Sequence, residues 1–163
     1  IIFDYLFCQD HSENEDEFSA FLKYRNKDCI KFLAYIPRDY EYKIIEQEIM
    51  PYEKKLNIER YILDGIKMGQ IPYDISVEPF SDLKGTVFSA LQFAFYTNPK
   101  NIFLVGFDCS TMNVYNNRDE DYFYQFKSWE IIAEFTKRIG LYDRISSINP
   151  VNLKGIFRDI YTE

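Results

Sequence analysis

The sequence is poor in the residue types that most often mark a function. Its 163 residues include one histidine, three cysteines and six glycines. Cys8, Cys29 and Cys109 lie far apart and form no Cys-x-x-Cys pair, which disfavours a disulfide framework or structural zinc and favours reduced thiols in the core. Neither G-x-G-x-x-G nor G-x-x-x-x-G-K-[ST] occurs, so the residues indicate neither an ordinary dehydrogenase nor a P-loop enzyme.

Composition also disfavours two kinds of partner. The chain has 19 basic and 26 acidic residues, a net charge of −7, and no cluster of lysines and arginines, whereas a nucleic-acid groove requires a concentrated positive field. No apolar run approaches the ~20 residues of a membrane span. Asp4 interrupts the apolar start and no basic region precedes it, unlike a signal peptide. We expect no nucleic acid, no membrane span and a cytoplasmic location, with peripheral association at the inner face of the membrane left open.

Apolar and aromatic residues are plentiful, at 47% and 18% of the sequence. A chain of this length and composition can bury a sizeable core, so we expect a single domain over residues 1–163. Ile1 opens within an apolar run and is not preceded by an initiator methionine. This start suggests the C-terminal part of a longer chain, or a trimmed one.

Apolar runs and amphipathic segments alternate along the sequence, which predicts strands alternating with helices. Residues 64–82 carry two glycines and two prolines and are expected to form a loop. Strands are expected over 1–7, 29–36, 57–63, 101–108 and 144–148, the third covered on one side as at a sheet edge; helices are expected over 12–22, 39–49, 85–96 and 122–139, with a short tail helix over 153–160. The pattern predicts an α/β, Rossmann-like domain with a mainly parallel sheet and helices on both faces.

The most informative stretch is a glycine-started helix that leads into a buried strand ending on an acid. The helix begins at Gly85 and Thr86, and the strand ends at Asp108. Carboxyl ends of parallel strands and amino ends of the neighbouring helices face the ligand crevice of an open α/β sheet, so these residues are expected to line one cleft. Thr86 suits a carboxylate or phosphate, and Asp108 a sugar or ribose hydroxyl. The structural alternative is that both are ordinary cap or turn residues.

His11 is the only side chain whose unperturbed pKa lies near neutrality, and it follows the first expected strand on the ligand side of the sheet. A catalytic role and an exposed position before a helix cap are both compatible with that placement. Asp119 and Asp121 form an Asp-x-Asp, a pattern that can hold a divalent metal on a nucleotide diphosphate. No apolar strand directly precedes them, which favours a solvated loop.

Residues 110–121 have no apolar period and are expected to form a mobile lid that a donor orders. Tyr115 and Arg118 lie within it. Aromatic rings stack on sugars or bases, and a guanidinium pairs with phosphate, so this segment suits a sugar or nucleotide cleft. The alternative is an ordinary surface loop with chance placement of these residues.

Three blocks in the second half of the chain, residues 85–94, 101–108 and 148–157, resemble the C-terminal half of bacterial lipooligosaccharide sialyltransferases and the related pterin-diphosphokinase-like proteins of surface-polysaccharide synthesis. The resemblance implies a Rossmann-like fold that binds a cytidine monophosphate sugar without metal. It implies that Thr86 contacts the donor carboxylate and that Asp108 is the strand-end aspartate. It also implies two phosphate-binding tyrosines. Ser110 occupies the position of the first, and Tyr115 is the nearest tyrosine to the second. The family's histidine base has no counterpart in the corresponding region of this chain.

The sequence therefore predicts a glycosyltransferase-like, sialyltransferase-like domain that transfers a sugar from a nucleotide-activated donor to a carbohydrate acceptor in bacterial surface polysaccharide or lipooligosaccharide synthesis. No metal and no cofactor besides the donor are expected, and a homo-oligomer is left open. Two alternatives stand beside it: pterin-diphosphokinase-like pyrophosphoryl transfer, and a non-catalytic domain that binds a sugar nucleotide or a partner. The candidate catalytic residues are His11 and Asp108, and the candidate donor-binding residues are Gly85, Thr86, Ser110, Tyr115, Arg118 and Asn149.

Overall fold

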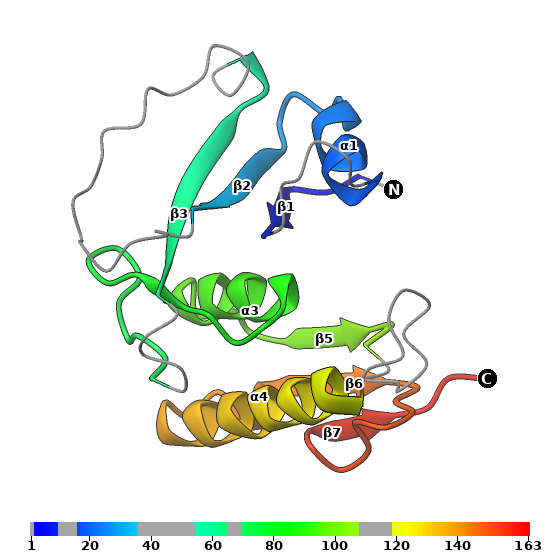
Figure 1. Ribbon diagram of the computed structural model, residues 1–163. Helices are drawn as coiled ribbons and strands as arrows, with labels where there is room; N and C mark the ends of the chain where they lie inside the picture. The colour runs from blue at the N-terminus through cyan, green and yellow to red at the C-terminus, as the bar shows by residue number, and fades with distance from the viewer. Residues whose placement is uncertain (1, 10–15, 36–54, 65–69, 108–118) are drawn as a thin grey trace.

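The computed structural model describes residues 2–9, 16–35, 55–64, 70–107 and 119–163. Parallel strands with helices on both faces give the α/β, Rossmann-like architecture that the sequence predicts (Figure 1). The strands of the described residues form a four-stranded sheet, in the order β1-β2-β3-β4, and a three-stranded sheet, in the order β5-β6-β7. The described strands thus form two parallel sheets that follow one another in sequence.

The first sheet is formed by β1 (Tyr5–Cys8), β2 (Ile30–Tyr35), β3 (Ile58–Asp64) and β4 (Phe80–Ser81). Neighbouring strands are parallel, with Tyr5 opposite Ile30 and Lys31 opposite Ile58. Helix α1 (Asp16–Lys23) covers one face, where Phe21 packs with buried residues of all three long strands. The other face packs against α3 (Thr86–Tyr96), since the Phe93 ring lies 5.1 Å from that of Phe32.

The second sheet is formed by β5 (Ile102–Val105), β6 (Ile145–Ile148) and β7 (Arg158–Ile160), again all parallel. One face packs on α3 and on α4 (Asp119–Arg138), and the short 3-10 helix η1 (Tyr142–Arg144) leads into β6. Phe88 of α3 meets Trp129 of α4 edge to face, at 4.9 Å between ring centroids. Leu104 of β5 and Ile145 of β6 complete this core.

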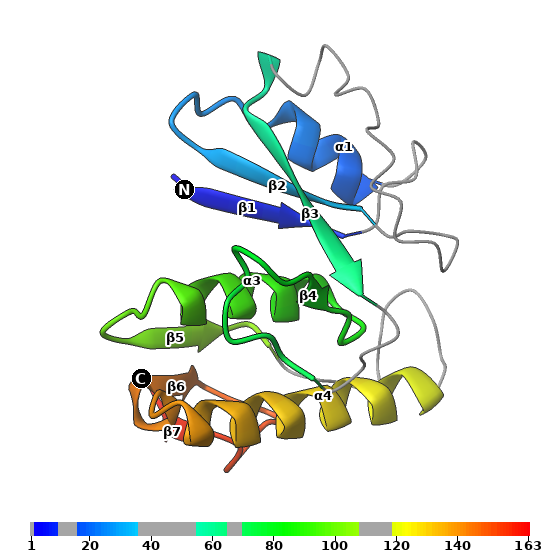
Figure 2. The same cartoon turned by 90° about the vertical axis from the view of Figure 1, so that its left-hand side faces the viewer.

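Helix α3 is shared by the two sheets. Both views in Figures 1 and 2 place it between β1 and β5. One side carries Phe93 against the first sheet, and another side carries Leu91 and Phe95 into the core beneath the second. A helix that is buried on several sides must be apolar on several sides, which explains its sequence.

Three expected elements differ from the structure. The third strand, β3, is interior rather than an edge, because it pairs with both β2 and β4. The expected loop at 64–82 contains β4, and the expected tail helix at 153–160 is replaced by turns and strand β7. Gly155 has a φ of 76° and its N–H donates to the Asp159 carboxylate, an arrangement that ends any helix there.

The expected boundaries also shift at two places. Strand β1 begins at Tyr5, and Ile2 before it is 83% exposed, so the apolar start is not buried strand. Helix α4 begins at Asp119, which makes Asp119 and Asp121 helical rather than part of a loop. The expected helix at 39–49 and the expected cap at Ser12 lie outside the described residues.

Candidate functional site

Polar residues gather where the carboxyl ends of β1, β3 and β4 meet the amino end of α3. Gln9 follows β1, Asp64 ends β3 and Asp82 follows β4, and each is at most 7% exposed. Lys84 precedes the helix that starts at Thr86. We call Gln9, Asp64, Asp82, Lys84 and Thr86 the strand-end cluster. Their position matches the crevice in which open α/β sheets bind ligands.

Asp82 organises this cluster through its carboxylate. Its Oδ1 accepts hydrogen bonds from Gln9 Nε2 at 3.2 Å and from the Lys84 backbone N–H at 2.9 Å. The Asp82 backbone N–H donates to the Asp64 carbonyl at 3.2 Å. A buried carboxylate is tolerated only when such donors surround it. The bonds therefore fix the turn between β4 and α3 to the ends of β1 and β3.

Lys84 lies in the left-handed region of backbone conformation, with a φ of 61°. Its side chain is 56% exposed, and its Nζ lies 3.5 Å from Asp82 Oδ2. The Asp82 carboxylate therefore neutralises the charge of the Lys84 ammonium group only in part. Most of the Lys84 side chain faces solvent beside the start of α3. That position suits a cation that meets an anionic ligand.

The amino end of α3 is open to an anion. Its N-cap residue is Gly85, which provides no side-chain cap, and its first turn contains no acidic residue. The first N–H groups of a helix lack intrahelical acceptors and carry the positive end of the helix dipole. With Lys84 beside them, the N–H groups of Thr86 and Val87 form an arrangement that favours a carboxylate or phosphate.

Three buried hydrogen bonds from two side chains, Gln92 and Ser128, hold the turn in place from outside the cluster. Gln92 of α3 accepts from the Ser81 N–H at 2.8 Å and donates to the Ser81 carbonyl at 3.0 Å, which clamps β4 to the helix. Ser128 of α4 donates to the Leu83 carbonyl at 2.7 Å. The backbone at 81–83 is thus fixed by both helices, so the cluster is pre-formed rather than assembled by a ligand.

The sequence-predicted site residues divide into three groups. Gly85 and Thr86 lie in this region, as N-cap and first residue of α3. Asn149 follows β6, has a φ of 48°, and uses both ends of its amide on Thr162, at 2.8 and 2.9 Å. His11, Asp108, Ser110, Tyr115 and Arg118 lie outside the described residues, so their roles and the shared cleft of Thr86 and Asp108 stay predictions.

Sequence reasoning missed Gln9, Asp64, Asp82 and the role of Lys84. The one local signal was the run Asp82-x-Lys84-Gly85 directly before an apolar helix, since aspartate often accepts from the N–H two residues on. Gln9 carries no such signal, because its partner Asp82 is 73 positions away.

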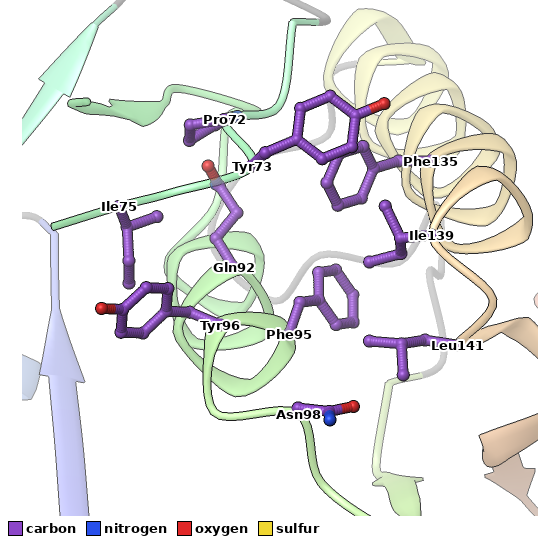
Figure 3. A pocket seen from close by; sticks show the side chains of 10 residues that line it. All are labelled: Pro72, Tyr73, Ile75, Gln92, Phe95, Tyr96, Asn98, Phe135, Ile139 and Leu141. Atoms are coloured by element: carbon purple, nitrogen blue, oxygen red, sulfur yellow. The ribbon is translucent and has the colours of Figure 1, made fainter. Parts of the chain in front are cut away.

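A pocket of about 200 Å³, lined by both aromatic and polar side chains, lies at the opposite end of α3 (Figure 3). Figure 3 shows Tyr73, Phe95 and Phe135 around it, with the amides of Gln92 and Asn98 at its margin. Gln92 is engaged with Ser81, and Asn98 Oδ1 accepts from Arg144 at 2.9 Å. Because its two amides already have partners, this pocket offers less polar recognition than the strand-end cluster.

A wider groove of about 590 Å³ lies beside the first sheet and is mainly apolar. The wall of this groove is formed largely by Phe32, Ile62, Phe93 and Tyr96.

Among the described residues, no group of three or more His, Cys, Asp or Glu side chains could hold a metal ion. The same part of the chain contains no helix that is both long and apolar enough to cross a bilayer. Cys8 and Cys29 are buried thiols, as expected of small core residues.

Comparison with protein-family models, with curated proteins and with solved structures finds no match for this chain.

Proposed function

We propose that this chain is a glycosyltransferase-like domain that binds a nucleotide-activated acidic sugar at the strand-end cluster. The observation that carries the proposal is the uncapped, lysine-flanked start of α3 beside the buried pair Gln9 and Asp82. An anion site and a rigid polar site lie next to each other there. A sugar nucleotide has both a phosphate and hydroxyls, and a sialic-acid donor adds a carboxylate.

In such a transfer an acceptor hydroxyl oxygen attacks the anomeric carbon while the bond from that carbon to the phosphate oxygen breaks. The phosphate leaves with the bonding electrons, and a base takes the hydroxyl proton. We assign Lys84 and the N–H groups of Thr86 and Val87 to the donor carboxylate or the leaving phosphate, where fixed positive charge stabilises the developing anion. Asp82 and Gln9 hold the turn and orient a sugar hydroxyl.

The predicted catalytic residues fit this assignment by their place in the sequence. His11 lies two positions after Gln9, and Asp108 lies two positions after Gly106, whose φ of 77° turns the chain at the end of β5. We propose His11 as acceptor base and Asp108 as ligand of a hydroxyl, with Ser110, Tyr115 and Arg118 contributing to donor binding. The donor is proposed to be a cytidine monophosphate sugar, and the acceptor a carbohydrate of the bacterial surface, assembled on the cytoplasmic side.

Titration calorimetry with cytidine monophosphate, its sialic-acid conjugate and a uridine diphosphate sugar whose sugar carries no charge tests the proposal. We expect the acidic conjugate to bind most tightly, and Lys84→Ala to weaken it about tenfold, the effect of one charge-assisted contact. Lys100→Ala, at an exposed lysine beyond the other end of α3, is the matched control and should leave the affinity unchanged. If none of the three nucleotides binds, the proposal is wrong.

Adding a chelator to the same titration separates the main alternative. Binding without metal is expected for the sialyltransferase-like function. Affinity that is abolished by chelation would favour pyrophosphoryl transfer instead and would direct attention to Asp119 and Asp121, in the first turn of α4. Tight binding without release of cytidine monophosphate in the presence of acceptor sugars would favour a non-catalytic, sugar-nucleotide-binding domain.

A further inference from the structure

The peptide group between Leu83 and Lys84 is held at both ends by buried side chains. Its carbonyl oxygen accepts from Ser128 Oγ at 2.7 Å, and its N–H donates to Asp82 Oδ1 at 2.9 Å. Ser128 and Asp82 are 5% and 7% exposed, so water competes little for either bond. Ser128 belongs to α4 and lies 45 positions along the chain from Leu83. A second helix therefore fixes this one peptide group of the turn between β4 and α3.

The same peptide group precedes a residue in an unfavourable conformation. Lys84 has a φ of 61°, in the left-handed region, where the Cβ of a lysine crowds the carbonyl oxygen that follows. Rotating the peptide by half a turn would carry this φ to roughly −120°, in the broad β region that lysine adopts readily. Leu83 packs in the core beneath the second sheet. Because the rotation takes place about the line that joins two Cα atoms, it leaves the Leu83 side chain in that core.

Both hydrogen bonds oppose this rotation. A turned peptide would point its carbonyl oxygen away from Ser128 and toward the Asp82 carboxylate, so that an acceptor faces an acceptor. The Asp82 carboxylate also accepts from Gln9 Nε2 at 3.2 Å and lies 3.5 Å from Lys84 Nζ. Displacing this carboxylate would change where the Lys84 ammonium lies relative to the start of α3. The orientation of one peptide group therefore controls the geometry of the candidate anion site.

We propose that Ser128 is a positioning residue of the strand-end cluster. Its hydroxyl keeps the peptide between Leu83 and Lys84 in the orientation that holds Lys84 left-handed, with its ammonium beside the start of α3. Ser128 acts through this peptide and not by contact with a ligand. The inference rests on the proposed function only in taking Lys84 as the cation that meets the carboxylate or phosphate of the donor. Its conformational part is independent of any ligand.

Amide hydrogen exchange tests the conformational part. Ser128→Ala removes the bond to the Leu83 carbonyl, so the peptide can rotate and the N–H of Lys84 loses its acceptor. We expect the protection of this N–H to fall by about tenfold or more. The matched control is Thr136→Val, because Thr136 is a fully buried hydroxyl of the same helix that donates at 2.9 Å to the Ala133 carbonyl within α4. Unchanged protection in Ser128→Ala, or an equal loss in Thr136→Val, would overturn the proposal.

Lys84→Gly separates positioning from a general loosening of the turn. Glycine adopts the left-handed region without strain, so a chain carrying both Lys84→Gly and Ser128→Ala has little reason to rotate the peptide. After correction for intrinsic exchange rates, the amide at position 84 should recover most of the protection lost in Ser128→Ala alone. A bond with a merely structural role would give no such rescue. Absence of recovery would therefore overturn the proposal.

Titration calorimetry with the sialic-acid conjugate of cytidine monophosphate tests the functional part. We expect Ser128→Ala to weaken binding about threefold, less than the loss of the Lys84 charge itself. In a chain that already carries Lys84→Ala, the same change should have no further effect, because it acts through Lys84. Equal weakening in both backgrounds would overturn the positioning role. If no nucleotide binds the parent chain, the proposed function is wrong, and the exchange results still decide whether Ser128 holds Lys84.

Discussion

The two sheets rest on the same helix but are stabilised differently. Beneath the second sheet, the buried apolar residues of α3, α4, β5 and β6 form one continuous core. The first sheet divides its buried residues between two smaller clusters, one against α1 and one on the opposite face, toward α3. The difference indicates a hierarchy: the C-terminal half can hold α3 without the first sheet, whereas the first sheet depends on α3 for one of its two cores.

The largest effect is expected from Ile132→Ala, because Ile132 is fully buried between α4 and the second sheet. The variant should lose about 3.5 kcal/mol of unfolding free energy from lost burial and the cavity left behind. Since α3 is held by this core, both halves should unfold earlier. Urea denaturation followed by fluorescence of Trp129, the sole tryptophan, and by far-UV circular dichroism measures this. Lys127→Ala, at an exposed position of the same helix, is the control; an equal shift in both variants would contradict the hierarchy.

Phe93→Ala tests the other direction of dependence. Phe93 is half-buried against three aromatic rings of the first sheet. We expect a loss of about 2.5 kcal/mol, less than for a fully buried ring. The loss should fall on β1 and β2, whose amides should exchange faster, while the Trp129 fluorescence transition keeps its midpoint. If the midpoint of the Trp129 fluorescence transition instead fell by as much as the faster exchange in β1 and β2 implies, the two halves would depend on each other equally.

Gln92→Leu sharpens the comparison at the junction of the halves. The change removes the acceptor of the Ser81 N–H and the donor to the Ser81 carbonyl. Two buried backbone groups then lose their partners, which we expect to cost about 2 kcal/mol. Amide exchange at Ser81 should rise while exchange in β6 does not. Unchanged protection at Ser81 would show that β4 is held by β3 alone.

The smallest effect is expected for Lys31→Met, in the core of the first sheet. Lys31 is 2% exposed, and its Nζ donates to the Tyr24 carbonyl at 2.8 Å. At neutral pH the variant should differ from the parent chain by roughly 1 kcal/mol, the net value of such a bond.

The pH dependence of that variant gives the sharper test. Burial lowers the pKa of Lys31 below its ordinary 10.5, so between the lowered value and 10.5 the unfolded chain binds more protons and the unfolding free energy rises with pH. Lys31→Met lacks this rise. Cys29 acts in the opposite sense, because burial raises the pKa of its thiol above 9.0. Urea denaturation from neutral pH to about 10 should therefore show a difference that grows in favour of the parent chain; a constant difference would contradict the burial of a charged Lys31.

Local sequence patterns were sufficient to predict an element where its own residues mark both its type and its ends. Helix α3 is recognisable because its glycine start and continuous apolar character coincide, and β2 and β6 because each is a short run bounded by turn residues. Strand β4 escaped prediction because it has two residues, and its existence depends on pairing with β3 and on the clamp from Gln92.

The candidate site was predictable only at its helix. Thr86 and Gly85 follow from the rule that helix starts face the crevice. The buried bond between Gln9 and Asp82 joins residues 73 positions apart, and no periodicity or spacing reports a contact at that distance. Strand β7 has the same origin: Arg158–Ile160 is a strand because β6 lies beside it.

The backbone at Lys84 has a consequence for engineering this protein. A lysine at a φ of 61° stores about 1 kcal/mol that glycine would release. A laboratory selection for heat resistance alone would thus enrich Lys84→Gly, raising the melting temperature while removing the cation beside the start of α3. Such a variant should have a higher melting temperature and a lower affinity for anionic ligands. Thermal stability and ligand binding therefore favour different residues at this position.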